Sequence, residues 1–212
     1  MKNKLKYIMA FLFMMCILYS GVLNKILSKI SFIKNLPNIY HDIIFFMEYI
    51  LIIVVLGIIL RKKIKVKEYL KNFKKNLKST ISYIIVIFVC ETVTTILLTT
   101  IIGKNPVEYT DTGWSSIFFL VSAVVLGPIV EELTFRGLLA EIISNKYVYY
   151  IVSSFVFAIM HFIGEINNMI NFLWIVPYFC TGLFLAYGYK KTDNIVFTIL
   201  IHIIINTISL VI

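Results

Sequence analysis

The sequence predicts an all-α fold, a polytopic bundle of about seven transmembrane helices, within a range of six to eight. Hydrophobic residues make up 60% of the 212 positions and the mean hydropathy is +0.92, whereas a soluble domain is typically about 45–50% apolar. Several apolar runs reach the ~20 residues that a membrane-spanning helix needs. Basic residues, which give a formal net charge of +9, gather beside these runs. We therefore expect a multi-pass protein of the cell membrane, surrounded by the lipid bilayer.

Two spans and one surface helix are expected in the first part of the chain. Met1–Lys6 is basic and leads into the apolar run Tyr7–Leu23. This run lacks a cleavage site of small residues, so we expect a retained first span rather than a signal peptide. Leu23–Lys34 has apolar residues on one helical face and polar residues opposite, which predicts a helix lying in the membrane interface. Ile39–Leu60 is the second expected span.

The segment Arg61–Lys78 carries most of the basic charge. Its apolar residues repeat at helical spacing: Val66, Leu70, Phe73 and Leu77. This pattern predicts a basic amphipathic helix on the membrane surface, beside anionic lipid. No nucleic-acid partner is expected, because no aromatic or motif context accompanies the charge. Ile81–Ile102 follows as the third span.

Four further spans are expected in the C-terminal half: residues 114–143, 148–163, 169–189 and 195–212. Gly127-Pro128 predicts a break or kink in the fourth span. Pro177 predicts a kink in the sixth, or its division into two short helices. Asp193 or Asn194 can cap the seventh. With the N-terminus in the cytoplasm, the inner segments hold most of the lysines, as the positive-inside rule requires.

The fourth span contains the sequence V-E-E-L-T-F-R-G, which places three ionisable groups in an apolar run. Each charge at mid-membrane depth costs roughly 2.5–3.5 kcal/mol, so such residues are expected to be functional. Glu132 and Arg136 are four residues apart and share a helix face, which predicts an ion pair. Glu131 is rotated about 100° from Glu132 and can point elsewhere. The simpler alternative is that Glu131 itself pairs with Arg136.

Two later spans add polar groups at similar depth. The fifth carries His161, four residues after Phe157, and the seventh carries His202 and Asn206 on one face. A bundle that turned these groups and Glu131 inward would enclose a polar cavity. There the carboxylate can act as a general base and a histidine can relay the proton. An amide and a second imidazole can donate to an oxyanion, so we predict hydrolysis of an amide bond by water.

The three motifs together resemble those of the CPBP family, the Abi group of intramembrane peptidases that includes the type II CAAX prenyl endopeptidases. The matching residues are Glu131, Glu132 and Arg136, then Phe157 and His161, then His202 and Asn206. The resemblance covers residues 114–212 of an expected single membrane domain, 1–212, with residues 1–113 as variable N-terminal spans. It implies about eight helices.

The resemblance also implies residue roles. Glu131, with help from His161, would activate water, and His202 with Asn206 would stabilise the oxyanion. Glu132 and Arg136 would support the site, and Phe157 is expected to pack. The substrate would be a membrane-embedded or lipid-tethered peptide, with bacteriocin processing or self-immunity as one setting.

Several alternatives remain open at this stage. No cofactor is required, but zinc bound by Glu131, His161 and His202 with a water would also suit a hydrolase. A non-catalytic immunity protein or scaffold that binds a peptide or partner is the main non-enzymatic alternative, and a transporter is another. Two more intramembrane glutamates, Glu48 and Glu91, would either neutralise Arg136 or line the cavity.

Overall fold

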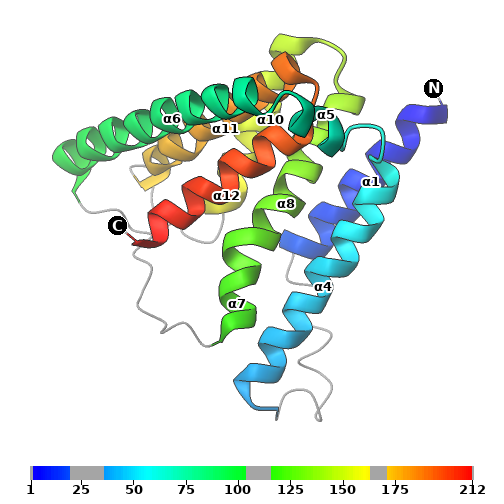
Figure 1. The fold of residues 1–212 in the computed structure, drawn as a ribbon. Coiled ribbons are helices and arrows are strands. Elements are labelled where there is room, and N and C mark those ends of the chain that lie inside the picture. Colours follow the sequence, from blue (N-terminus) through cyan, green and yellow to red (C-terminus); the bar gives the residue numbers. More distant parts are fainter. Residues whose placement is uncertain (1, 20–35, 104–115, 163–170, 212) are drawn as a thin grey trace. The chain divides into compact units, whose positions relative to one another are not determined.

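The computed structural model describes residues 2–19, 36–103, 116–162 and 171–211 (Figure 1). These residues are almost entirely helical, and none of them forms a strand. Among them, four helices are long and apolar enough to cross a membrane: Asn38–Ile59, Lys74–Ile102, Ile117–Ile142 and Phe172–Thr192. The predicted all-α membrane fold is therefore confirmed.

Helices also occupy the positions of the other three expected spans. These are α1 (Lys2–Tyr19), α10 (Lys146–Phe162) and α12 (Ile195–Val211). A helix of 17 residues, such as α10 or α12, is about 26 Å long at 1.5 Å per residue. This is slightly less than the ~30 Å hydrocarbon core, so the number of crossings stays a prediction. The interfacial helix expected at 23–34 lies outside the described residues.

The chain divides into two compact units, each with its own packing. The first comprises residues 1–61 and 111–142. Its helices are α1, α4 (Asn38–Ile59) and a helical stretch built from five consecutive pieces: α7 (Ile117–Val121), η1 (Ser122–Leu126), α8 (Gly127–Glu131), η2 (Glu132–Leu138) and α9 (Leu139–Ile142). α4 packs along this stretch from α7 to η2, and α1 packs on η2 and α9.

A side-chain hydrogen bond fixes where this helical stretch begins. Ser116 is its N-cap, and its Oγ accepts a hydrogen bond from the Phe119 amide at 3.2 Å. The same Oγ donates to Asp42 Oδ2 at 2.7 Å. Ser116 therefore satisfies an otherwise orphaned amide and ties the start of the stretch to α4.

The chain stays helical from Ile117 to Ile142, so of the break or kink expected at Gly127-Pro128 the break is absent. The irregularity instead takes the form of two π-helical segments, η1 before α8 and η2 after it. Pro128 lies in the first turn of α8. A proline has no N–H to donate to the preceding turn, and the wider π turn accommodates that loss. Such π segments are frequent at functional sites.

The second unit comprises residues 62–110 and 143–212. Its helices are α5 (Val66–Lys71), α6 (Phe73–Ile102), α10, η3 (Asn171–Trp174), α11 (Ile175–Thr192) and α12. α6, α11 and α12 lie side by side, and α11 also packs against α10 (Figure 1). A side chain at Gly182 would place its Cβ 2.9 Å from the Ser154 Cα, so this glycine permits the close approach of α10 and α11.

Two sequence expectations need correction in this unit. The surface helix expected over 61–78 is two pieces, because α5 ends at Lys71 and α6 begins at Phe73 after a turn at Asn72. Pro177 lies within the apolar stretch Phe172–Thr192, in the first turn of α11, where a proline is tolerated, so α11 continues unbroken to Thr192 and the sixth span is not divided there. The cap expected for the seventh span is confirmed, since Asn194 Oδ1 accepts a hydrogen bond from the Val196 amide at 3.1 Å.

Candidate active site

The acidic motif lies in the first unit, where α8 passes into η2. Glu132 and Arg136 are both fully buried. Arg136 Nη1 lies 3.1 Å from Glu132 Oε1, so the ion pair predicted from the spacing is present. Two buried charges tolerate this environment only when they are paired, because removing either partner leaves an uncompensated charge.

Glu131, the last residue of α8, is partly buried. Tyr49 of α4 lies within electrostatic range of the Glu131 carboxylate. One turn earlier, the Tyr49 ring lies 3.7 Å from the position that a Cβ on Gly127 would take. A phenol beside a carboxylate can donate a hydrogen bond to it. Tyr49 is therefore a site neighbour that the sequence did not reveal, since a tyrosine in an apolar span carries no specific signal.

His161 lies in the last turn of α10, in the second unit. Its Nδ1 is 2.8 Å from the Phe157 carbonyl oxygen. A carbonyl only accepts, so Nδ1 carries the hydrogen and a neutral imidazole keeps its lone pair on Nε2. The Tyr178 ring stacks on this imidazole with the centroids 5.1 Å apart. These contacts fix both the orientation and the tautomer of His161.

Phe157 contacts both histidines among the catalytic candidates of the second unit. Its ring centroid is 4.4 Å from that of His161 and 5.6 Å from that of His202. Phe157 and His202 are buried, at 2% and 3% exposure. The two imidazoles are thus held on one aromatic ring, which matches the packing role expected for Phe157. Asn206, half-buried, lies one turn after His202 on the same helix.

Glu91 of α6 is a second neighbour of the candidate site, and the sequence alone did not assign it a partner. Its Oε1 accepts a hydrogen bond from the Thr181 hydroxyl of α11. It also lies within electrostatic range of His202. Of the two sequence alternatives for Glu91, the structure therefore favours a place beside the polar groups of its own unit. The Thr181 partner comes from a distant part of the chain, which is why no local pattern reveals it.

The predicted site residues thus form two groups, each ordered within its own unit. Glu131, Glu132 and Arg136 belong to the first, and His161, His202 and Asn206 to the second. The convergence of these groups on one cavity stays a prediction. Across the described ranges, no three His, Cys, Asp or Glu side chains gather as metal ligands, so the zinc alternative also stays a prediction.

Residues 113–208 match the family model described as Type II CAAX prenyl endopeptidase Rce1-like. The resemblance read from the three motifs is therefore confirmed over this part of the chain. The family is one of membrane proteases. All the motif residues of both units lie within the matched range.

Two curated relatives were found. The chain is 31% identical over 104 residues to the UPF0177 protein YxdF of Lactococcus lactis subsp. lactis, covering 45% of this chain and 54% of the relative. It is 35% identical over 98 residues to an uncharacterized protein of Mycoplasma capricolum subsp. capricolum, covering 45% of this chain and 27% of that protein. The matches thus span about half and about a quarter of the lengths of these relatives. No solved structure matches the chain.

Proposed function

From the place of residues 113–208 in the type II CAAX prenyl endopeptidase family, we propose that this protein is an intramembrane peptidase. Its substrate is a membrane-embedded or lipid-tethered peptide, and its reaction is hydrolysis of one peptide bond by water. The observation that carries the proposal is the pair of imidazoles held on the Phe157 ring within the matched region. Imidazoles held in one orientation are suited to proton transfer, so this arrangement favours a catalytic role over a purely structural one.

In the proposed mechanism, Glu131 accepts a proton from the attacking water. The water oxygen bonds to the carbonyl carbon, and the negative charge develops on the carbonyl oxygen. His202 and Asn206 donate hydrogen bonds to that oxygen. The carbon–nitrogen bond then breaks as the proton passes to the leaving amine, which yields a carboxylate and an amine.

His161 supplies the second proton-transfer group. With its Nδ1 hydrogen directed at the Phe157 carbonyl, Nε2 is the atom that exchanges a proton with Glu131 or the leaving amine. Glu132 and Arg136 support the site through their buried ion pair, which joins successive turns of the helix that carries Glu131.

Substitution of Glu131 tests this mechanism directly. The variant Glu131→Gln keeps the shape of the side chain and removes its basicity, so peptide cleavage should fall by about 10²–10⁴-fold. Glu68→Gln, which makes the same change at an exposed glutamate outside the motif helices, is the control and should cleave normally. A first substrate can be found by comparing membrane-peptide profiles of wild-type and Glu131→Ala strains. If purified Glu131→Gln protein cleaved as fast as wild type, the mechanism would be wrong.

The zinc form of the mechanism has a separate test. In that form, Glu131, His161 and His202 would hold a zinc ion, which would make a bound water more acidic. Metal analysis of the purified protein and cleavage after chelation distinguish the two forms. Loss of activity with rescue by zinc alone supports the metal site. Full activity after chelation, with no bound metal, supports the metal-free mechanism.

The biological setting belongs to the same proposal. We propose processing of a secreted peptide such as a bacteriocin, or self-immunity against one, with the N-terminus in the cytoplasm. A Glu131→Gln strain that still protects cells from a peptide toxin would point to a non-catalytic immunity or scaffold protein instead. If a cysteine introduced at position 4 reacted with a membrane-impermeant thiol reagent added outside intact cells, the cytoplasmic position of the N-terminus would be contradicted.

A further inference from the structure

The segment Lys62–Lys78 presents two kinds of exposed side chain. Six lysines are exposed: Lys62, Lys67, Lys71, Lys74, Lys75 and Lys78. Exposed apolar side chains lie among them, with Val66 at 47%, Leu70 at 58% and Leu77 at 41% exposure. We call these nine residues the basic surface. Water alone does not favour exposed leucines among lysines, but the headgroup region of a membrane accommodates both.

The backbone beneath the basic surface is firmly held. Tyr69 points inward with 4% exposure, and its hydroxyl lies 3.0 Å from Thr80 Oγ1 of α6. The Asn76 side-chain amide donates to the Tyr69 carbonyl at 2.8 Å. These bonds hold α5 against α6 with Tyr69 inside, so Val66 and Leu70 stay outside. The surface is therefore preformed.

Two other lysines of this segment, Lys63 and Lys65, form ion pairs within the protein. Lys65 Nζ and Lys63 Nζ lie 2.9 and 3.3 Å from the carboxylate of Asp193, in the turn between α11 and α12. The Lys63 carbonyl also accepts from the Ile195 amide at 3.3 Å. By contrast, none of the six exposed lysines forms an ion pair within the part of the chain that the structure describes. Their charges are available to an external anion.

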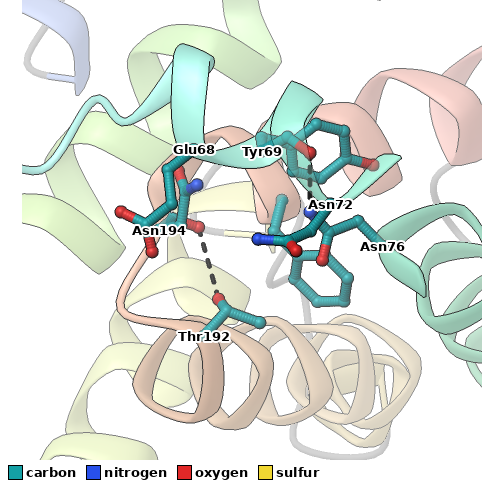
Figure 2. Close-up of a pocket in the computed structure, with 7 residues that line it drawn as sticks. Glu68, Tyr69, Asn72, Asn76, Thr192 and Asn194 are labelled. Carbon is teal, nitrogen blue, oxygen red and sulfur yellow. Dashed lines mark hydrogen bonds between the residues drawn. The ribbon is translucent and has the colours of Figure 1, made fainter. Parts of the chain in front are cut away.

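A polar pocket lies at this end of the unit. Figure 2 shows the pocket, with the carboxylate of Glu68 and the amide groups of Asn72 and Asn194 among its lining. Its volume of about 60 Å³ is room for a few water molecules. Such groups need water and do not face hydrocarbon. α6 begins beside the pocket and continues as an apolar helix to Ile102, so the headgroup region lies at the level of α5.

We propose that the basic surface binds acidic phospholipids of the leaflet that it faces, which the positive-inside rule makes the cytoplasmic one. The six lysines contact lipid phosphates, and Val66, Leu70 and Leu77 enter the boundary between headgroups and acyl chains. This interaction does not depend on whether the protein cleaves peptides.

Thermal unfolding in detergent with added lipid tests the proposal. A lipid that binds the folded protein raises its unfolding temperature. Phosphatidylglycerol should stabilise the wild-type protein at lower concentrations than phosphatidylcholine, and this preference should shrink at high salt because the charges are screened. The triple variant Lys71→Gln, Lys74→Gln, Lys75→Gln should need roughly 100-fold more phosphatidylglycerol, at about 1 kcal/mol for each lysine.

The double variant Lys63→Gln, Lys65→Gln is the matched control. It removes two charges from the same segment, but these belong to the Asp193 contact. We expect a lower unfolding temperature without lipid and an unchanged response to phosphatidylglycerol. The proposal is overturned if the triple variant responds to phosphatidylglycerol as the wild type does, or if phosphatidylcholine stabilises the wild type equally well.

Discussion

Phe157 illustrates how one apolar side chain can govern two polar ones. Its ring touches both His161 and His202, and its carbonyl fixes the hydrogen on His161. Truncating a buried phenylalanine to alanine typically costs 3–5 kcal/mol of stability, whereas leucine keeps most of the apolar volume and should cost less. We expect Phe157→Leu to unfold at only a slightly lower temperature than wild type but to lose most peptidase activity, because the imidazoles lose their shared support. Activity that follows stability in parallel would contradict this.

Glu91 gives a second prediction at this scale. Glu91→Ala removes the acceptor of the Thr181 hydroxyl and the carboxylate near His202. A buried polar group left without a hydrogen bond costs about 1–3 kcal/mol of stability. Glu91→Gln keeps an acceptor for Thr181 and should lose less stability. Chemical unfolding in detergent measures both variants. If alanine and glutamine were equally stable, the Thr181 hydrogen bond would contribute nothing.

At the scale of elements, the packing of α10 on α11 depends on Gly182. A methyl group there would lie 2.9 Å from the backbone of Ser154, whereas at Gly188 the nearest atom, at 3.0 Å, belongs to the Tyr83 ring. Side chains can shift more readily than backbone, so Gly182→Ala should destabilise the protein more than Gly188→Ala. Overpacking typically costs 1–3 kcal/mol. Thermal unfolding of the two variants provides the comparison.

The turn between α11 and α12 carries a pH-dependent contact. Burial alone would raise the pKa of Asp193, but the hydrogen bond from Lys65 and the nearby Lys63 hold it below its ordinary value. Its stabilisation is therefore present above the unfolded pKa near 3.8 and is lost as pH falls through the lower folded pKa. The side chain is 58% exposed, so the effect should be less than about 1 kcal/mol.

Asp193→Asn isolates that charge. Asp193 has a left-handed backbone, with φ of 47°, which asparagine also adopts readily. The variant should lose a little stability at neutral pH and should become less sensitive to acid than the wild type. Unfolding temperatures between pH 2 and 7 measure this. A wild-type pH profile in the variant would show that the contact with Lys63 and Lys65 is not stabilising.

For the whole molecule, the features that the sequence predicts arise from neighbouring residues, and those that it does not predict arise from contacts between distant parts of the chain. Hydropathy located α4, α6 and α11, and four-residue spacing predicted the Glu132–Arg136 pair, because both are consequences of neighbouring residues. The π segments around α8 and the turn at Asn72 were missed, since tertiary packing and not local sequence selects them. Tyr49 and Thr181 were missed because each meets its glutamate from a distant helix.

The convergence of the acidic and histidine motifs is the prediction on which the peptidase mechanism depends. In a variant lacking Cys16, Cys90 and Cys180, cysteines at positions 131 and 202 should be joined by a short thiol crosslinker in native membranes. The matched control pairs position 131 with Thr207, an exposed residue five positions beyond His202 and therefore on a different face of α12. A pocket that holds both motifs requires efficient crosslinking of the first pair and little of the second. Equal crosslinking of both pairs, or none, would mean that water, carboxylate and imidazole do not meet as the mechanism requires.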